Sequence, residues 1–241
     1  MITTTVWPRE YAVGVTTVML LRHGRSTANA EGILAGWTPG VGLDDVGQEQ
    51  ARAAARRLQE VRFSAVVTSP LERCRQTADA IARRKRQDLP IHTDLDLAEA
   101  RYGDWTGQPL TELAEDPLWS AVQHHPSGVT FPGGESMVAV SNRAVSAIRR
   151  WNRRLGDKAT YVVVSHGDVI KAILADALGM HLDLFQRLQI DPCSVSVIRY
   201  TAQRPFVARL NDVGGDLSAF SPGRRRRAAS SDAVVGGESG A

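Results

Sequence analysis

The chain has 241 residues, of which 43% are hydrophobic and 23% are charged, and this composition is typical of a soluble globular protein with one α/β domain or two small ones. The 29 basic and 26 acidic residues nearly balance to a net charge of +3, which argues against a nucleic-acid partner. No apolar run approaches the ~18 residues of a membrane span and no signal-peptide cleavage site follows the first apolar stretch, so we predict no membrane partner and a cytoplasmic location. The two cysteines, Cys74 and Cys193, lack the spacing of metal ligands.

The first predicted strand, at residues 18–21, ends abruptly at Arg22 and His23, which a glycine follows. A short apolar run of this kind is typical of a buried parallel strand that stops at a tight loop. Ligands of open α/β sheets bind outside the carboxyl ends of the strands, so an arginine and a histidine there are placed for chemistry on an anion. The alternative is a surface histidine in a polar loop. The pattern recurs where a second apolar strand, at residues 161–164, leads to His166 and another glycine, which favours a functional site.

Apolar spacing and turn residues predict the other elements and the domain limits. Helices are expected after Asp44 or Asp45 and over residues 71–86, 137–155 and 168–178. Further strands are expected at residues 63–68, 89–93, 195–200 and 206–210, and the last two are expected to form a closing hairpin. Residues 29–43 are expected to form a long loop. The folded domain is predicted to span residues 17–212. A loose extension is predicted at residues 1–16 and a disordered tail at residues 213–241.

Two more charged residues have candidate roles at this stage. Arg73 falls in the first turn of the helix predicted over residues 71–86, where free N–H groups and the helix dipole favour an anion. A basic residue there is unfavourable unless a negative group lies nearby, although a solvent-facing arginine is an equally good interpretation. Glu99 follows the strand predicted at residues 89–93, and composition alone favours its interpretation as a solvated carboxylate.

Four motifs, taken in order, resemble the histidine phosphatase superfamily in its phosphoglycerate-mutase-like branch. They are Leu21-Arg22-His23-Gly24 with Ser26, the run Ser69-Pro70-Leu71-Glu72-Arg73-Cys74-Arg75-Gln76-Thr77-Ala78, Glu99 with Gly103-Asp104-Trp105-Thr106-Gly107, and Ser165-His166-Gly167. The resemblance covers roughly residues 17–212 and, with residues 191–196, points to an actinobacterial subgroup labelled as phosphomutases or phosphatases. It implies a three-layer α/β/α sandwich around a mostly parallel sheet with one antiparallel strand.

The resemblance also implies catalytic roles. His23 would be the nucleophile that attacks phosphorus and forms a phosphohistidine. Arg22, Arg73 and His166 would hold the phosphoryl oxygens, and arginine suits this task because its planar fork is always charged. Glu99 would protonate the leaving oxygen and then activate the water that hydrolyses the phosphohistidine.

Several further residues match the family pattern less closely. Asn29 and Gly36 match loop positions that contact phosphate in relatives, whereas Ser26 and Thr27 either contact phosphate or hold the loop. We expect Arg143 to support the site from behind or to lie on a helix surface. No cofactor and no metal are implied.

The segment at residues 108–133 is predicted to cap the phosphate site and to select the substrate. It is irregular, contains four prolines and concentrates Trp119, His124, His125 and Phe131. The alternative is an inert excursion on the surface. Nothing in the spacing of its two histidines supports a zinc site.

We therefore predict a phosphomonoester hydrolase that acts on a small phosphorylated metabolite. Glycolytic mutases of the family carry a tryptophan and an asparagine soon after Arg-His-Gly, and an Arg-Arg pair after the catalytic glutamate. This chain has Thr27-Ala28-Asn29 at the first place and no Arg-Arg pair between Glu99 and Ser146, which favours hydrolysis over a phosphomutase reaction. A catalytically weak binding or regulatory protein is a third hypothesis, against which the intact set of catalytic residues argues. Whether the chain forms a homo-oligomer is left open.

Overall fold

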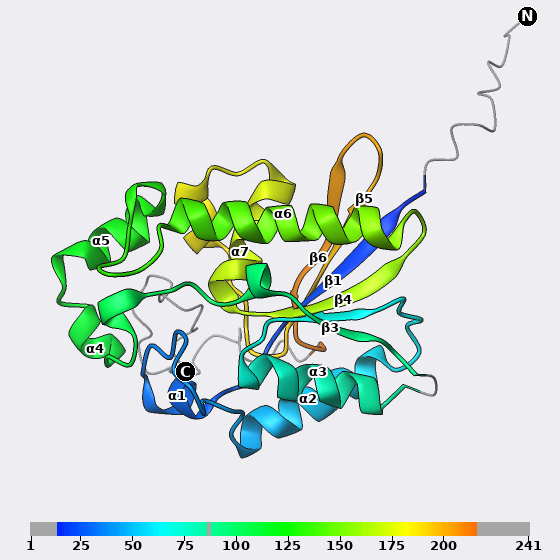
Figure 1. Cartoon of the computed structure of the whole chain (residues 1–241), viewed down its shortest axis with the longest axis horizontal. Coiled ribbons are helices and arrows are strands. Elements are labelled where there is room, and N and C mark those ends of the chain that lie inside the picture. Colours follow the sequence, from blue (N-terminus) through cyan, green and yellow to red (C-terminus); the bar gives the residue numbers. More distant parts are fainter. Residues whose placement is uncertain (1–13, 86–87, 216–241) are drawn as a thin grey trace, which may run out of the picture.

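A single six-stranded sheet forms the centre of the computed structural model, which describes residues 14–85 and 88–215 (Figure 1). The strands are β1 (Thr16–Arg22), β2 (Val66–Thr68), β3 (Ile91–Thr93), β4 (Thr160–Ser165), β5 (Val195–Tyr200) and β6 (Pro205–Asp212), in the order β3-β2-β4-β1-β5-β6. The first four run parallel, and β5 is antiparallel to both of its neighbours. This arrangement confirms the mostly parallel sheet with one antiparallel strand.

Helices cover both faces of this sheet, which confirms the three-layer sandwich (Figure 1). The α-helices are α1 (Thr27–Glu31), α2 (Asp45–Leu58), α3 (Glu72–Arg83), α4 (Leu110–Leu113), α5 (Pro117–His124), α6 (Met137–Leu155) and α7 (Gly167–Leu178). Apolar residues of α2 and α3 pack on one face, and those of α6 and α7 pack on the other. No helix within the described residues is long and apolar enough to cross a membrane.

Strand β4 shows why the central strands are apolar throughout. Tyr161 and Val163 belong to the core beneath α6 and α7, whereas Val162 and Val164 belong to the core beneath α2 and α3. All four side chains are fully buried. A strand that is covered on both faces loses the alternation of polar and apolar residues, which is the pattern expected in a parallel sheet.

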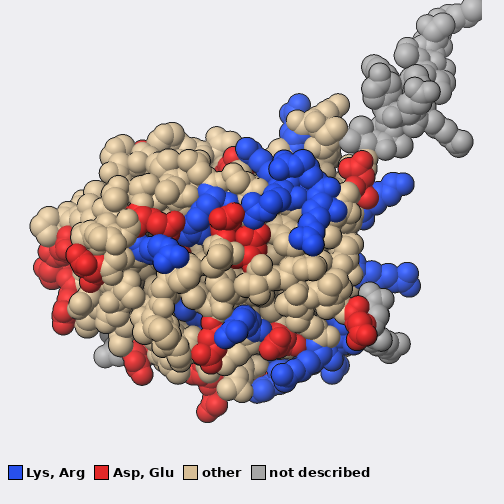
Figure 2. All heavy atoms as spheres, viewed as in Figure 1, with Lys and Arg blue, Asp and Glu red and all other residues tan. Residues whose placement is uncertain are grey.

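The exposed side of α6 accounts for much of the basic surface visible in Figure 2. Arg149, Arg150, Arg153 and Arg154 lie there, while Ile148 and Trp151 face the core. Arg150 donates to Asp94 (2.7 Å) and to Asp96 (3.0 Å), so part of this charge is neutralised locally.

The register of the sheet brings the chemistry-bearing residues to one edge. Arg22 of β1 lies opposite Ser165 of β4, and Thr68 of β2 lies opposite Val164. The residues that follow, His23, Ser69 and His166, therefore emerge close together at the carboxyl ends of three neighbouring strands. This is the edge at which open α/β sheets bind ligands.

Several local features differ from the sequence prediction, among them the lengths of α3, β3 and β6. The loop expected at residues 29–43 begins inside α1, because Ser26 caps that short helix. The strand expected at residues 63–68 is shorter, since β3 pairs only with Val66–Thr68. β1 begins at Thr16, within the predicted extension, and residues 1–13 of that extension and 216–241 of the predicted tail lie outside the described residues.

Candidate active site

Four of the predicted site residues come together where β1, β2 and β4 end. His23 directly follows β1, His166 directly follows β4, and Arg73 lies in the first turn of α3. Glu99 reaches the same place from the loop that follows β3. None of the four is more than 3% exposed, so their interactions are weakly screened by water.

The imidazole of His23 presents one ring nitrogen to the site. Its Nδ1 lies 2.7 Å from the Gly24 carbonyl oxygen, so Nδ1–H donates there and Nε2 keeps the lone pair. Arg73 Nε donates to this Nε2 over 3.3 Å. Burial, followed by the nearby guanidinium groups of Arg73 and Arg22, holds the pKa of His23 well below its ordinary value of 6.5. The ring is therefore neutral at pH 7, as a nucleophile must be.

Arg73 links the two histidines to the loop after α1. Its Nη2 donates to the Gly36 carbonyl oxygen (3.0 Å) and lies 3.3 Å from His166 Nδ1. The guanidinium group thus touches both imidazoles and the loop at once. A planar cation in this position, at the start of a helix, is well placed to bind a tetrahedral anion.

His166 lies edge-on to His23, with ring centroids 5.2 Å apart and an interplanar angle of 63°. Its Nε2 is 2.7 Å from Ser69 Oγ, and its Nδ1 is 3.6 Å from Glu99 Oε2. Burial, then the charges of Arg73 and His23, place the pKa of His166 well below 6.5. This ring is also neutral at pH 7.

Glu99 has the properties of a proton donor. Burial, followed by repulsion from the Asp168 carboxylate, raises the pKa of Glu99 from 4.5 to about 7, although Arg73 opposes the shift. Asp168 in turn accepts a hydrogen bond from the Tyr102 hydroxyl (3.1 Å). A carboxyl group with a pKa near 7 can both give and take a proton at neutral pH.

The backbone of Glu99 is held by two side chains. Trp37 Nε1 donates to the Glu99 carbonyl oxygen over 2.8 Å, and Arg143 Nη2 donates to the same oxygen over 3.0 Å. Arg143 also pairs with Glu135 (2.8 Å) and donates to two more carbonyl oxygens of the loop before Glu99. Arg143 therefore supports the site from behind, which is one of the two alternatives left by the sequence.

The remaining predicted residues surround this cluster. Arg22 is fully buried and donates to the Ile190 carbonyl oxygen over 2.7 Å. Asn29 Oδ1 accepts from the backbone N–H of Ser26 (2.9 Å) and lies 2.8 Å from its Oγ, so these two residues hold the start of α1. Gly36 has a φ of +48°, and a Cβ there would lie 2.9 Å from Thr106 Oγ1, so both conformation and space require glycine.

A small pocket of about 20 Å³ lies beside this cluster, and neither Arg22 nor His166 is among the residues that line it. Its lining includes His23, Ser26, Asn29, Gly36, Arg73 and Glu99, together with the apolar Ile33, Leu34 and Leu110. A larger groove of about 520 Å³ lies between α2 and α3 and contains none of the predicted site residues.

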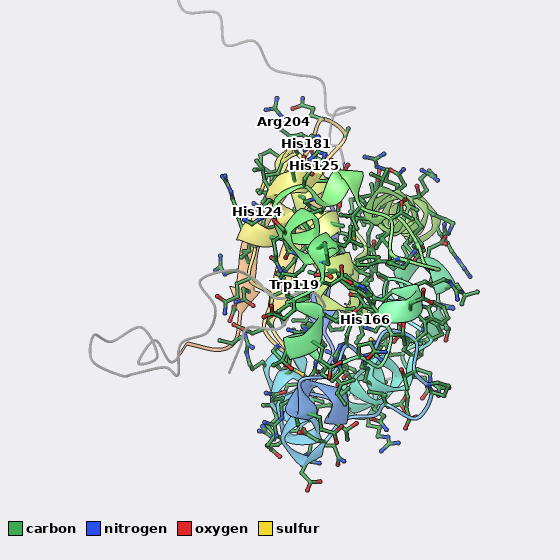
Figure 3. The ribbon with its side chains drawn as sticks, turned by 90° about the vertical axis from the view of Figure 1, so that its left-hand side faces the viewer. Trp119, His124, His125, His166, His181 and Arg204 are labelled. Atoms are coloured by element: carbon green, nitrogen blue, oxygen red, sulfur yellow. The ribbon has the colours of Figure 1, made fainter. Side chains whose placement is uncertain are left out.

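The segment at residues 108–133 contributes to this cavity mainly through Leu110. Phe131 is buried and packs on Tyr102 at 4.9 Å between ring centroids, so it supports the cavity wall from the core. His124 and His125 lie at the outer surface, away from His166 (Figure 3). The ring of His125 pairs instead with Asp183 at 3.0 Å.

Several residues at the site, among them Ser69 and Thr77, carried no assigned role at the sequence level. Ser69 contacts the His166 ring, as described above. Thr77 Oγ1 accepts from the Gly24 N–H (3.2 Å) and donates to the Arg73 carbonyl oxygen (2.8 Å), which ties the loop after β1 to α3. A small hydroxyl side chain on a helix gives no local signal of such a contact. In the described part of the chain, no group of three or more His, Cys, Asp or Glu residues is arranged to hold a metal ion.

The fold and site define an α/β protein with two histidines and an arginine converging at a strand edge. The model of the histidine phosphatase superfamily (branch 1) matches residues 18–213. The chain belongs to this superfamily.

Comparisons with individual proteins agree. The chain is 35% identical over 207 residues to "Bifunctional protein Rv2228c" of Mycobacterium tuberculosis, covering 84% of this chain and 55% of the relative, so it spans about half of that protein's length. It is 30% identical to Phosphoserine phosphatase 1 of Hydrogenobacter thermophilus, covering 80% of this chain and 91% of the relative. The solved structure of Bacillus stearothermophilus YhfR matches with a TM-score of 0.77 and 29% identity, covering 83% of this chain and 98% of that one.

Proposed function

We propose that this chain hydrolyses small phosphomonoesters in two steps through a phosphohistidine at His23. The observation that carries the proposal is the buried contact of Arg73 with both His23 and His166, beside a carboxyl group of raised pKa. Both imidazoles are neutral at pH 7, and Glu99, with a pKa of about 7, can give or take a proton there.

In the first step, His23 Nε2 attacks phosphorus and the bond from phosphorus to the leaving oxygen breaks. The neutral ring supplies the electron pair, and Glu99 gives its proton to the leaving oxygen. Arg22, Arg73 and His166 stabilise the charge on the phosphoryl oxygens. Asn29 and Gly36 border the space that these oxygens would occupy. Phosphoryl transfer depends mainly on such positioning and charge stabilisation.

In the second step, water attacks the phosphohistidine. Glu99, now a carboxylate, takes a proton from the water, the phosphorus–nitrogen bond breaks, and phosphate leaves while His23 returns to its neutral form. Because Glu99 has a pKa near 7, it can alternate between acid and base without a large cost.

Water, rather than a second hydroxyl of the substrate, is the proposed acceptor. A phosphomutase must hold a sugar acid while its intermediate reorients, and this chain lacks the Arg-Arg pair expected for that purpose. We therefore infer a phosphatase whose substrates are small phosphorylated metabolites. Phosphoserine, named for one relative, and 3-phosphoglycerate are suitable first candidates.

The test uses the full chain with p-nitrophenyl phosphate, phosphoserine and 3-phosphoglycerate, measuring phosphate release and isomerisation. We expect phosphate release from at least one of them and a phosphoenzyme that maps to His23. The His23→Ala variant should show no turnover above background, while His124→Ala, an exposed histidine, should keep normal activity. Normal activity in a folded His23→Ala protein would refute the nucleophile. Isomerisation faster than phosphate release would instead identify a mutase.

A further inference from the structure

One side of the pocket beside the catalytic cluster is apolar. The residues of this apolar wall are Ile33, Leu34, Ala35 and Leu110. Leu34 is 3% exposed and belongs to the core, whereas the other three are only partly buried, and Leu110 packs against the same core. The apolar wall therefore rests on the core and still presents apolar surface to a molecule that enters the pocket.

Backbone hydrogen bonds hold the apolar wall in place. The Leu34 N–H donates to the Gln108 carbonyl oxygen over 3.0 Å, and the Gly107 N–H donates to the Leu34 carbonyl oxygen over 2.8 Å. The Leu110 N–H donates to the Gly32 carbonyl oxygen, also over 2.8 Å. These bonds join the loop after α1 to the start of the predicted cap, so the apolar wall is formed before any substrate binds.

The pocket offers few positive charges to a substrate. Arg73 is the one arginine or lysine that lines it in the described part of the chain, and the proposed mechanism already assigns Arg73 to the phosphoryl group. Arg101, two positions after Glu99, does not line the pocket, and its guanidinium carbon lies 3.9 Å from the centre of the Trp37 ring. A carboxylate on the substrate would therefore meet the apolar wall without a cation, and burying an unpaired charge is costly.

We propose that the apolar wall is the subsite for the alcohol part of the substrate, so that phosphomonoesters of uncharged, apolar alcohols are preferred. In the proposed mechanism, on which this inference rests, Glu99 gives its proton to the leaving oxygen, which therefore lies beside Glu99. Because Glu99 and the apolar wall line the same pocket, the carbon chain on that oxygen extends along the wall. Ile33 and Leu110, which are only partly buried, are then specificity-determining residues.

Straight-chain alkyl phosphates test this subsite, because their leaving groups have nearly the same basicity and differ only in apolar length. A fully buried methylene group changes an equilibrium about fourfold, and a half-covered one changes it about twofold. From ethyl to butyl phosphate, kcat/KM of the full chain should therefore rise at least about fourfold. Phosphoserine and 3-phosphoglycerate, which carry a carboxylate, should have a lower kcat/KM than butyl phosphate.

Leu110→Ala tests the apolar wall directly, and the chain offers a matched control. In this variant, the ratio of kcat/KM for butyl phosphate to that for ethyl phosphate should fall below about twofold, because the longer chain loses its contact. Leu178→Ala removes the same atoms from the end of α7, where Leu178 is 45% exposed and does not line the pocket. This control should keep the wild-type ratio.

Each outcome decides the proposal. A wild-type ratio below about fourfold overturns it, even if Leu110→Ala does not fold, and so does a carboxylated ester that is hydrolysed as well as butyl phosphate. An unchanged ratio in folded Leu110→Ala overturns it as well.

If no ester is hydrolysed, calorimetric binding of ethylphosphonate and butylphosphonate decides instead. Tighter binding of butylphosphonate by the wild type, but not by Leu110→Ala, would leave the apolar subsite standing while the proposed function fails. Binding that does not depend on chain length, or no binding of either phosphonate, would overturn the subsite too.

Discussion

Replacing Glu99 by glutamine tests whether burial keeps this carboxyl group protonated. The pKa of Glu99 rises from 4.5 to about 7 because the folded protein disfavours the buried carboxylate. A shift of about 2.5 units corresponds to ~3 kcal/mol, at 1.36 kcal/mol per unit. The raised pKa of Glu99 therefore contributes to the free energy of unfolding. This contribution is fully present below pH 4.5 and is lost as the pH rises through about 7. Glutamine cannot ionise, so Glu99→Gln escapes this loss.

The assay is urea unfolding of wild type and variant between pH 4 and pH 9. Between pH 4 and pH 9, the free energy of unfolding of the wild type should fall by about 3 kcal/mol relative to that of Glu99→Gln. This value is an upper limit, because the site can relax around the carboxylate. Glu112→Gln is the control, because Glu112 is exposed in α4. A difference that does not depend on pH would refute the reasoning that burial raises the pKa of Glu99.

The same variant separates the two catalytic steps. For an alkyl phosphomonoester, kcat should fall by about 10² to 10⁴, the usual contribution of a positioned acid. p-Nitrophenolate leaves without a proton, so its release should survive as a rapid burst, after which the phosphohistidine accumulates because no base activates water. Equal losses for both substrates, without a burst, would argue against Glu99 as the acid.

Two further predictions concern the residues that hold the site. Arg73→Lys should lower kcat/KM at least about 100-fold, since one ammonium group cannot replace the contacts that the guanidinium makes with His23, Gly36 and His166. A loss below tenfold would contradict this prediction. Arg75→Lys, at an exposed position of α3, is the control. Arg143→Met should lower the free energy of unfolding by about 2–3 kcal/mol in urea titrations and also lower kcat, because it unpairs Glu135 and removes one of the two donors to the carbonyl oxygen of Glu99. A normal kcat in the folded variant would show that Glu99 does not depend on this support.

Local patterns in the sequence were sufficient for most strands and helices, whereas the three-layer architecture was implied by the family resemblance. The uninterrupted apolar runs of β1 and β4 identified strands buried on both faces, and the glycine after each histidine marked where they stop. Because parallel strands end at one sheet edge, strand direction places His23 and His166 at the same edge, and the pairing of β1 with β4 brings them together. The helical spacing of α6 identified that helix to within a residue or two, and the structure shows Ser136 as its N-cap.

Contacts between distant residues were decided only by the tertiary structure. Ser69 meets His166 across 97 positions and Arg143 reaches the Glu99 carbonyl oxygen across 44, and neither pair leaves a local signal. The expected cap at residues 108–133 shows the same limit, because its aromatic and histidine residues divide between core and surface according to how the segment packs. Periodicity and turn residues are read within a few positions of the chain, whereas hydrogen-bond partners and burial depend on sheet register and on which elements pack together.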